Sequence, residues 1–545
     1  MRSGMHASLH AATLVGATAF LVEVQVDLSL GLPGFHLVGL PDSACIEARV
    51  RCLTAIKNSG FVLPQKRITV NLAPADLRKE GASFDLPIAL GVLSAAGLLR
   101  GEPIPTALVA GELSLTGEVL PIRGMLPLAL EARRRGLSTL IVPASNAAEA
   151  ALAQGLTVLA VRTLEEAAAH LSGERRLQPY LTSEAAPPTH SSELDLSDVR
   201  GQLSCKRALE IAAAGAHNAL LIGPPGSGKT LLARRLPTLL PALSFEEAIE
   251  STCIWSAAGR LAPGQGLLAQ RPFRAPHHSI SAGGLVGGGS PPRPGEISLA
   301  HNGVLFCDEL AEFNRSALEC LRQPLEEGEI TIVRTRGAIT LPARFTLLGA
   351  MNPCPCGFAN TPGARKCFCP PAAKDSYRRR LSGPLLDRFD LHIDAPPLTA
   401  DELCGPPEGE SSATVRARVQ SARELQRKRY SRLPGVHANG QLRGPHLRQT
   451  CQLTPDAART LRSALGSLHF SARAHDRVLK VARTIADLEG CARVGPEHVS
   501  EAVQFRSLDR SYVAPPELPP VFRAMGADPA DASRAGPPNE EREGT

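Results

Sequence analysis

The sequence is poor in aromatic residues and has no long apolar run. Phe, Trp and Tyr make up 4% of the 545 residues, so stacking of bases on aromatic side chains is not expected to dominate any nucleic-acid contact. No run reaches the roughly eighteen apolar residues that a membrane-spanning helix needs. The apolar segment 9–22 is followed by Glu23 and Asp27 and has no clear cleavage site, which argues against a signal peptide. We therefore expect a cytoplasmic protein without a membrane partner.

Positive and negative charges are nearly balanced: the sequence has 59 Lys and Arg residues and 53 Asp and Glu residues, for a net charge of +6. This small basic excess is compatible with nucleic-acid binding, and a GC-rich genome explains it equally well. Cysteine is not scarce: there are 13, several of them in one cluster. Reduced thiols or a bound metal in the cytoplasm suit this pattern better than disulfides.

A glycine-rich loop lies between an apolar run, 219–222, and the start of a helix. It matches G-x-x-x-x-G-K-S/T in the strand–loop–helix context that this motif requires. Glycines let backbone N–H groups surround phosphate oxygens, and a helix N-terminus favours bound anions. The predicted nucleotide-binding residues are Gly223, Pro224, Pro225, Gly226, Ser227, Gly228, Lys229 and Thr230. We expect Lys229 to reach the β- and γ-phosphates of ATP and the Thr230 hydroxyl to bind Mg²⁺.

Two further buried strands end in polar residues. The run 303–307 ends in Asp308 and Glu309, and the run 345–351 ends in Asn352. Downstream of a phosphate-binding loop, Asp308 is expected to complete the Mg²⁺ shell and Glu309 to polarise the attacking water. Asn352 is predicted to touch the γ-phosphate or that water.

Two C-x-C pairs follow directly, separated by ten residues rich in Gly and Pro. They are Cys354, Cys356, Cys367 and Cys369. Four thiolates within reach of one another suit tetrahedral Zn²⁺. The C-x-C spacing is tighter than the usual C-x₂-C, so buried free thiols and a redox-labile pair remain alternatives.

The N-terminal region alternates predicted strands and helices, which indicates an α+β domain. Strands are expected at 22–27, 67–72, 107–113 and 139–143, and helices at 43–56, 85–93 and 128–135. The stretches 71–76, 79–83 and 115–121 resemble the Lon-protease-like domain of the ribosomal-S5-type fold. Lon-type proteases use a Ser–Lys pair; Ser83 falls at or near the Ser position, but Leu126 occupies the Lys position. Because a Ser without a base is a weak nucleophile, we interpret Ser83 as structural and the domain as non-proteolytic.

The remaining chain is predicted to hold a linker, a motor core, a helical region and a tail. The expected domains are 1–173 (Lon-like), 174–195 (linker), 196–397 (P-loop core), 398–512 (helical) and 513–545 (disordered tail). In the core we expect a helix at 205–215, a helix at 316–325 and a hairpin within 330–341 with Arg334 and Arg336 near its tip. The glycine-rich segment 283–289 is interpreted as a mobile loop, and the loop residues His277 and His278 as solvated rather than metal-bound.

With these motifs together, the chain resembles the ComM/YifB family of Mg-chelatase-like AAA+ ATPases. The most specific stretches are 271–278, 294–303, 351–357 and 481–488. The resemblance implies a multidomain α/β fold with a Lon-like domain, an AAA+ P-loop core and a C-terminal helical lid. It also implies Arg388 as an arginine finger and Arg473 as a sensor-2 residue.

The function that the resemblance implies is a hexameric, ATP-hydrolysing DNA helicase. It would drive branch migration on single-stranded or branched DNA in natural transformation or homologous recombination. The segment 277–289 and the Arg334–Arg336 hairpin would then line the pore and bind phosphates. A chelatase-like or protein-remodelling ATPase is the alternative, and a Lon-type protease is less favoured.

Overall fold

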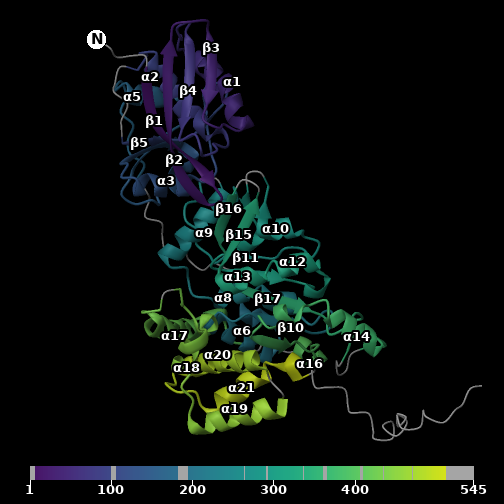
Figure 1. Ribbon diagram of the computed structural model, residues 1–545. Coiled ribbons are helices and arrows are strands. Elements are labelled where there is room, and N and C mark those ends of the chain that lie inside the picture. Colours follow the sequence, from purple (N-terminus) through teal and green to yellow (C-terminus); the bar gives the residue numbers. More distant parts are fainter. Residues whose placement is uncertain are drawn as a thin grey trace, which may run out of the picture.

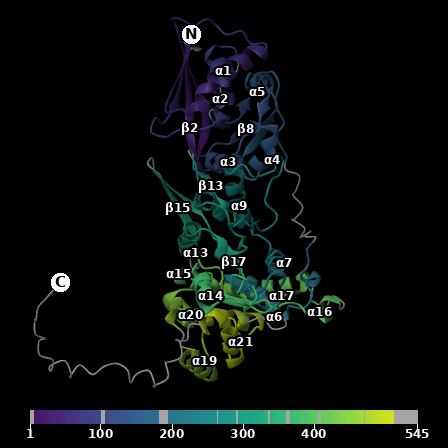
Figure 2. The same cartoon turned by 90° about the vertical axis from the view of Figure 1, so that its right-hand side faces the viewer.

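The computed structural model describes residues 6–99, 106–181, 194–262, 264–289, 292–334, 337–359, 365–404, 409–433, 435–468 and 471–510. An N-terminal sheet with its helices, a central sheet with its helices, and a C-terminal helical bundle follow one another along an elongated molecule (Figure 1, Figure 2). Most of the expected linker and the whole expected tail from 513 lie outside the described residues. None of the helices in those described segments is both long and apolar enough to cross a membrane.

A seven-stranded mixed sheet forms the N-terminal part, in the order β3-β4-β2-β1-β5-β8-β9. Its strands are β1 (His6–Val15), β2 (Thr18–Ser29), β3 (Gly34–Val38), β4 (Arg67–Ala73), β5 (Ala107–Val109), β8 (Thr139–Pro143) and β9 (Thr157–Val161). Its helices are α1 (Ser43–Asn58), α2 (Asp85–Ala95), α3 (Met125–Arg134), α4 (Ala147–Ala150) and α5 (Leu164–Leu171). The predicted start of α1 is confirmed, since the Asp42 carboxylate accepts from the backbone N–H of Cys45 at 2.8 Å.

The structure shows one strand pair in this part that was not predicted, and it corrects one predicted strand. The apolar segment 9–22 is most of an antiparallel β1–β2 pair that turns at Gly16, where φ is +67°. The single strand expected at 107–113 is broken into β5 and β6 (Glu112–Leu113), and β6 pairs with β7 (Val119–Leu120) instead. The break lies at Gly111, which donates its N–H to the Ser83 carbonyl at 3.0 Å. A Cβ at Gly111 would lie 2.9 Å from a Val119 methyl group, so the break lies where a side chain has no space.

The central part is a five-stranded parallel sheet in the order β11-β14-β17-β10-β18. Its strands are β11 (Phe273–Arg274), β14 (Val304–Cys307), β17 (Thr346–Met351), β10 (Ala219–Ile222) and β18 (Leu391–Asp394). The helices around it are α6 (Leu203–Gly215), α7 (Lys229–Ala233), α8 (Leu236–Leu239), α9 (Phe245–Ala257), α10 (Ala282–Val286), α11 (Glu296–Leu299), α12 (Arg315–Glu319), α13 (Arg322–Glu327), α14 (Pro371–Arg378) and α15 (Gly383–Leu386). Because the strands are parallel, all their carboxyl ends meet at one edge of the sheet.

Two predictions for the central part need correction. The helix expected at 316–325 is two short helices, α12 and α13, since Pro324 lacks an N–H and is tolerated only in the first turn of α13. The segment 283–289 is not a plain loop. It contains most of α10 and the short strand β12 (Gly287–Gly288), which pairs with β13 (Arg293–Pro294). The predicted hairpin is present as β15 (Glu329–Arg334) and β16 (Gly337–Pro342), while Arg336 lies outside the described residues.

The C-terminal part is helical, as its sequence pattern predicts. Its helices are α16 (Ala400–Cys404), α17 (Ser412–Tyr430), α18 (Gly444–Thr450), α19 (Pro455–Leu468), α20 (Ala472–Leu488), α21 (Pro496–Gln504) and α22 (Ser507–Arg510). Helices α17 and α20 pack on α6 and share one apolar core with the central sheet. This shared core ties the bundle to the strand that leads into the glycine-rich loop.

The N-terminal part contacts the central part through α3, α4 and α9. The buried carboxylate of Glu149 accepts from the Leu126 backbone N–H at 2.7 Å and from the Ser256 hydroxyl. Burial raises the pKa of Glu149. A Cβ at Gly16 would lie 2.6 Å from Ile339, so β16 also packs against the β1–β2 turn. Leu126 therefore lies at an interdomain contact.

Candidate functional site

The glycine-rich loop leaves the carboxyl end of β10 and enters α7 at Lys229. Gly226 and Gly228 have φ of +79° and +81°, a conformation that glycine adopts without strain. Gly223 is required for space, since a Cβ there would lie 2.2 Å from the Ala395 carbonyl oxygen. The loop thus has the tight curvature that turns backbone N–H groups toward an anion.

The Lys229 side chain folds back across this loop. Its ammonium donates to the carbonyl oxygens of Gly223 and Pro224, each at 2.8 Å, and to the Asn352 side-chain oxygen at 3.3 Å. Burial lowers the pKa of Lys229, and the nearby carboxylates of Asp308 and Glu309 oppose that shift. Asn352 and the predicted phosphate-binding residue Lys229 are therefore in contact.

Strand order explains how Asn352 and Asp308 reach the loop. β17 lies between β10 and β14, so Asn352 follows the strand in the middle and Asp308 the strand beyond it. The Thr230 hydroxyl donates to an Asp308 carboxylate oxygen at 2.7 Å. A hydroxyl and a carboxylate are the hard oxygen donors that Mg²⁺ prefers, so these two residues fit the predicted metal role.

Glu309 lies beside this pair in a strained backbone conformation. Its φ is +51°, which is uncommon outside glycine and recurs at functional sites. Its carboxylate is 56% exposed and pairs with Nδ1 of His278 at 3.0 Å. His278 was predicted to be solvated, and its contact with Glu309 was not predicted. The two residues are far apart in sequence, so only the tertiary structure brings them together.

The loop that carries His278 is held by two arginines. Arg274 makes a bidentate pair with Glu296 at 2.6 and 2.8 Å. Arg271 donates to the Asn302 carbonyl at 2.7 Å and to the Glu247 carboxylate at 2.9 Å. Arg271 and Arg274 therefore hold the His278 loop in place beside Asp308 and Glu309, which follow β14.

Arg388 and Arg473 lie at the opposite edge of the sheet. Arg388 precedes β18, and its carbonyl accepts from Asn218, the residue before β10, at 3.1 Å. The two ends of β10 are about 10 Å apart, so the Arg388 backbone and the glycine-rich loop are separated by the length of the strand. Arg473, 67% exposed, pairs at 2.6 Å with Asp387, the neighbour of Arg388.

The Arg388 side chain is only 11% exposed and pairs with Glu326. Burial lowers the pKa of its guanidinium, and so do the positive charges of Arg477, Arg322, Arg473 and Arg443. This second edge is therefore a cluster of arginines. Neither Arg388 nor Arg473 is seen to contact the glycine-rich loop of the same chain within the part that the structure describes.

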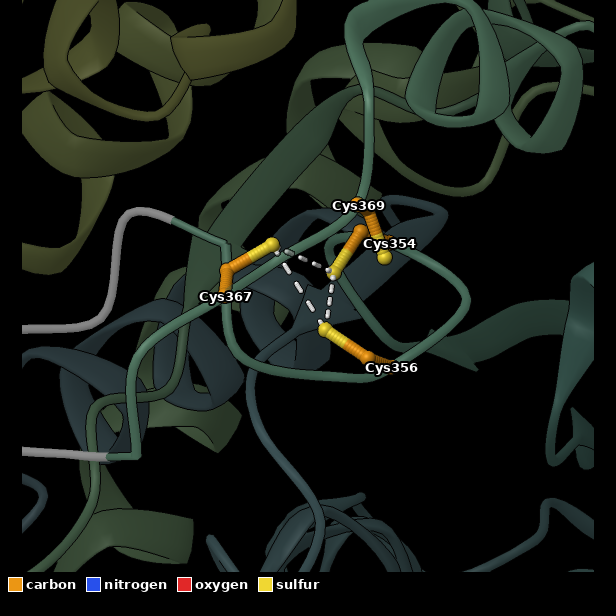
Figure 3. A group of neighbouring side chains, drawn as sticks. All are labelled: Cys354, Cys356, Cys367 and Cys369. Carbon is orange, nitrogen blue, oxygen red and sulfur yellow. Dashed lines mark hydrogen bonds between the residues drawn. The ribbon is translucent and has the colours of Figure 1, made fainter.

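The four predicted cysteines come together (Figure 3). The Sγ atoms of Cys354, Cys356 and Cys367 lie 3.3 to 3.7 Å from one another, and that of Cys369 lies within 4.8 Å of them. Hydrogen bonding, first from the Phe358 backbone N–H, lowers the pKa of Cys356. All four are free thiols and present the soft, tetrahedral donor set that Zn²⁺ prefers.

The Lon-like pair of positions does not form a catalytic pair in this chain. Leu126 is fully buried, and its backbone bonds to Glu149. Lys79, four residues before Ser83, is also buried and donates to the Pro74 carbonyl. Burial lowers the pKa of Lys79. The Ser83 carbonyl accepts from Gly111, which is a structural role.

A parallel sheet with a phosphate-binding loop, an acidic strand end and, between them, a buried strand that ends in a polar residue defines an AAA+-type P-loop ATPase. Three family models match along the chain: "Subunit ChlI of Mg-chelatase" over residues 24–146, "Magnesium chelatase, subunit ChlI" over 195–403, and "Magnesium chelatase, subunit ChlI C-terminal" over 409–506. The protein YifB of Salmonella typhimurium is 46% identical over 508 residues, covering 93% of this chain and 98% of that protein. The chain belongs to the ComM/YifB family of Mg-chelatase-like proteins.

Two further relatives have informative names. The competence protein ComM of Haemophilus influenzae is 45% identical over 501 residues, covering 91% of this chain and 96% of that protein. The DNA repair protein RadA of Pseudomonas aeruginosa is 36% identical over 162 residues, which is 29% of this chain and 34% of that protein.

Proposed function

We propose that this protein is a hexameric ATP-driven motor that acts on single-stranded or branched DNA in the cytoplasm. Branch migration during natural transformation or homologous recombination is the activity that we assign to it. Two similar proteins support this proposal. A relative that matches 91% of this chain is named a competence protein, and one that matches 29% of it is named a DNA repair protein.

The observation that carries the proposal is the separation of Arg388 from the glycine-rich loop. The carboxyl edge of the sheet holds Lys229, Asp308 and Asn352, whereas Arg388 lies at the amino edge with its carbonyl on Asn218. A guanidinium at that edge serves a nucleotide bound to a neighbouring chain. Head-to-tail contacts of this kind form a ring when the rotation from one chain to the next closes.

In the proposed reaction each residue has one task. Lys229 leaves the loop carbonyls and binds the β- and γ-phosphates, while Thr230 and Asp308 would hold Mg²⁺, which neutralises phosphate charge when bound. Glu309 accepts a proton from the attacking water, and Asn352 orients that water or the γ-phosphate. Arg388, and Arg473 beside it, stabilise the transition-state charge at the neighbour's nucleotide.

The DNA contact is assigned to the β15–β16 hairpin and the segment 277–289. The hairpin carries Arg334 at the end of β15, and positive charge suits phosphate binding. The middle of β16 packs against the N-terminal part, because Ile339 and Leu341 lie against Gly16. Substituting Arg334 should weaken DNA binding and lower its salt dependence by about one phosphate contact.

Zn²⁺ at the four cysteines is part of the proposal. The donor set supports it, and the metal would be structural because all four positions are taken by protein thiolates.

A chelatase-like or protein-remodelling ATPase is the second candidate, because all three family models are named for the chelatase subunit. In that case ATPase activity would respond to a partner protein and not to DNA. A Lon-type protease is the third, and peptidase activity lost in Ser83→Ala would support it.

The test is the ATPase rate of the full chain without DNA, with single-stranded DNA and with a branched junction, in wild type and Glu309→Gln. Stimulation by DNA that falls with rising salt and disappears in Glu309→Gln is the expected result. A Glu309-dependent rate that no DNA changes would overturn the DNA motor and favour the chelatase-like reading.

A further inference from the structure

The cysteine cluster has the dimensions of a zinc site. Four sulfurs bound to one Zn²⁺ at about 2.3 Å lie about 3.8 Å apart at the corners of a tetrahedron. The distances between Cys354, Cys356 and Cys367 are 3.3, 3.5 and 3.7 Å, close to that edge and far longer than a disulfide bond of about 2 Å. The cluster is therefore arranged around a common centre and not as two bonded pairs.

The segment that carries the cluster has little other support. Its described residues, 352–359 and 365–370, form no helix or strand, and Phe368 is 81% exposed. Of the four cysteines only Cys354 is buried, and the other buried positions of the segment are the small residues Gly357 and Ala359. A segment without a core of its own depends on cross-links for a defined shape, and a bound metal supplies them.

The cluster lies directly beside the nucleotide site. Cys354 is two residues after Asn352, which bonds to Lys229. Gly357 lies against the glycine-rich loop, because a Cβ built on it would come within 2.5 Å of the Pro225 ring, and its φ of +86° also favours glycine. Its N–H donates to the Cys354 carbonyl at 2.9 Å, which closes the turn on the cluster.

On the C-terminal side, the cluster continues into α14. Cys369 is followed by Pro370, which caps that helix, and the buried Tyr377 of α14 lies near Asn352. The cluster thus connects the end of β17, the glycine-rich loop and α14 at one point.

We propose that Zn²⁺ at Cys354, Cys356, Cys367 and Cys369 holds the Asn352 turn against the glycine-rich loop through the Gly357–Pro225 contact, so that nucleotide affinity depends on zinc. The proposal rests on the nucleotide site and the zinc site proposed above, and it is independent of DNA. Without zinc, the turn no longer positions Asn352 and Pro225, and the phosphates lose contacts that those residues fix.

The first experiment measures the metal. The full chain purified with reductant and Zn²⁺ should contain about one zinc per chain. Replacement by Co²⁺ should give the charge-transfer and d–d absorption of a tetrahedral thiolate site. Cys356→Ser should lose the metal, while Cys404→Ser, an exposed cysteine in α16, should keep it. Protein that holds no zinc under these conditions overturns the proposal.

The second experiment measures binding of a fluorescent, non-hydrolysable ATP analogue with excess Mg²⁺ present. Removing zinc from wild-type protein with a zinc-selective chelator should weaken binding about tenfold or more, and added Zn²⁺ should restore it. Affinity unchanged within about twofold overturns the proposal. Loss of the far-ultraviolet circular dichroism signal together with affinity also overturns it, since zinc would then hold the whole fold and not this contact.

A third variant separates the contact from the metal. Gly357→Ala should keep zinc but weaken nucleotide binding, because the added methyl group meets Pro225. Gly383→Ala is the control, since a Cβ there meets nothing within 4 Å. Equal affinity in both variants overturns the coupling. These readouts use neither DNA nor hydrolysis, so they stand or fall separately from the DNA motor.

Discussion

At the residue scale, the proposed hydrolysis assigns proton transfer to one carboxylate, that of Glu309, whose backbone is strained. Glu309 has φ of +51° and faces the site beside Asp308, whose carboxylate accepts from the Glu309 N–H at 2.9 Å. A residue is held in such a conformation only when its surroundings require it. The Glu309 carboxylate in this conformation is 56% exposed and lies 3.0 Å from Nδ1 of His278.

We predict that Glu309→Gln binds ATP like wild type but hydrolyses it about 10²- to 10⁴-fold more slowly. An amide keeps the shape of the side chain and cannot accept the proton of water. Glu312→Gln is the matched control, because Glu312 lies three residues away and pairs with Arg380. ATP binding and single-turnover hydrolysis measure the two steps. A similar loss in both variants would contradict the assignment.

His278 offers a second prediction. In the structure its imidazole pairs with Glu309 at 3.0 Å, which restrains the carboxylate that must accept a proton. We expect His278→Ala to raise the DNA-free ATPase rate by up to about fivefold, because an exposed ion pair is worth about 1 kcal/mol or less.

The control for His278 is the adjacent histidine. His277 bonds to Ser279 at 2.8 Å, so His277→Ala should leave the rate near that of wild type. A slower rate in His278→Ala would show that the imidazole orients Glu309 productively and does not restrain it.

At the scale of elements, a network of buried polar side chains connects the sheet to the helical bundle. His217, before β10, bonds to Asp390, before β18, at 3.0 Å and to Thr484 of α20 at 2.7 Å. Arg477 of α20 also donates to Asp390, at 2.5 Å. Although burial alone raises the pKa of Asp390, Arg477 and His217 more than offset it and hold that pKa well below its usual range.

This junction predicts a loss of stability in mild acid. Burial lowers the pKa of His217, so the folded protein keeps it neutral while the unfolded chain takes up a proton below about pH 6.5. The free energy of unfolding should therefore fall as the pH drops below about 6.5, by at most about 1.4 kcal/mol per pH unit from this group. Thermal unfolding at about pH 7.5 and about pH 5.5 measures the effect.

The comparison variant is His217→Gln, which keeps a hydrogen-bond donor but does not titrate. It should be less stable near neutral pH and lose less stability on acidification than wild type. His446→Gln, at an exposed position of α18, should follow wild type at both pH values. Parallel pH curves for all three proteins would rule out His217 as the source.

At the scale of the whole molecule, the sheet separates two groups of functional residues. The residues proposed to bind phosphate and magnesium lie at its carboxyl edge, and the arginine cluster around Arg388 lies at its amino edge. A single chain therefore presents one half of a proposed site on each side. This arrangement suits a ring in which each nucleotide is bound between two chains.

We predict that Arg388→Ala lowers the ATPase rate by about 10³-fold or more while leaving nucleotide binding intact. Arg388→Lys should recover little, since lysine lacks the planar fork of donors. Arg379→Ala, an exposed arginine on the surface after α14, is the control. Steady-state ATPase and nucleotide binding provide the two readouts.

Mixed rings test whether Arg388 acts between chains. When Arg388→Ala and Glu309→Gln chains are co-expressed in equal amounts, about a quarter of the interfaces should combine an intact Glu309 with an intact Arg388. The mixture should then hydrolyse ATP faster than either variant alone. No recovery would mean that Arg388 serves its own chain or none.

The sequence alone determined the parts of the site that local motifs carry. The glycine-rich loop and the strand ends at Asp308 and Asn352 are each specified by a few adjacent residues, because phosphate binding needs backbone of one local shape. The C-x-C pairs likewise predicted their own cluster. Strands with clear alternation, such as β4, and helices with a cap, such as α1, were also predicted. Breaks such as that at Gly111 were not, since they depend on packing against Ser83 and Val119.

Only the tertiary structure decided which residues face one another across the chain. The pair His278–Glu309, the contact of Gly357 with Pro225, and the location of Arg388 at the far edge from Lys229 all join or separate segments far apart in sequence. The strand order β11-β14-β17-β10-β18 fixes these relations, and no local pattern encodes that order. Motifs are set by the chemistry of neighbouring residues, whereas their mutual placement is set by how whole strands and helices pack.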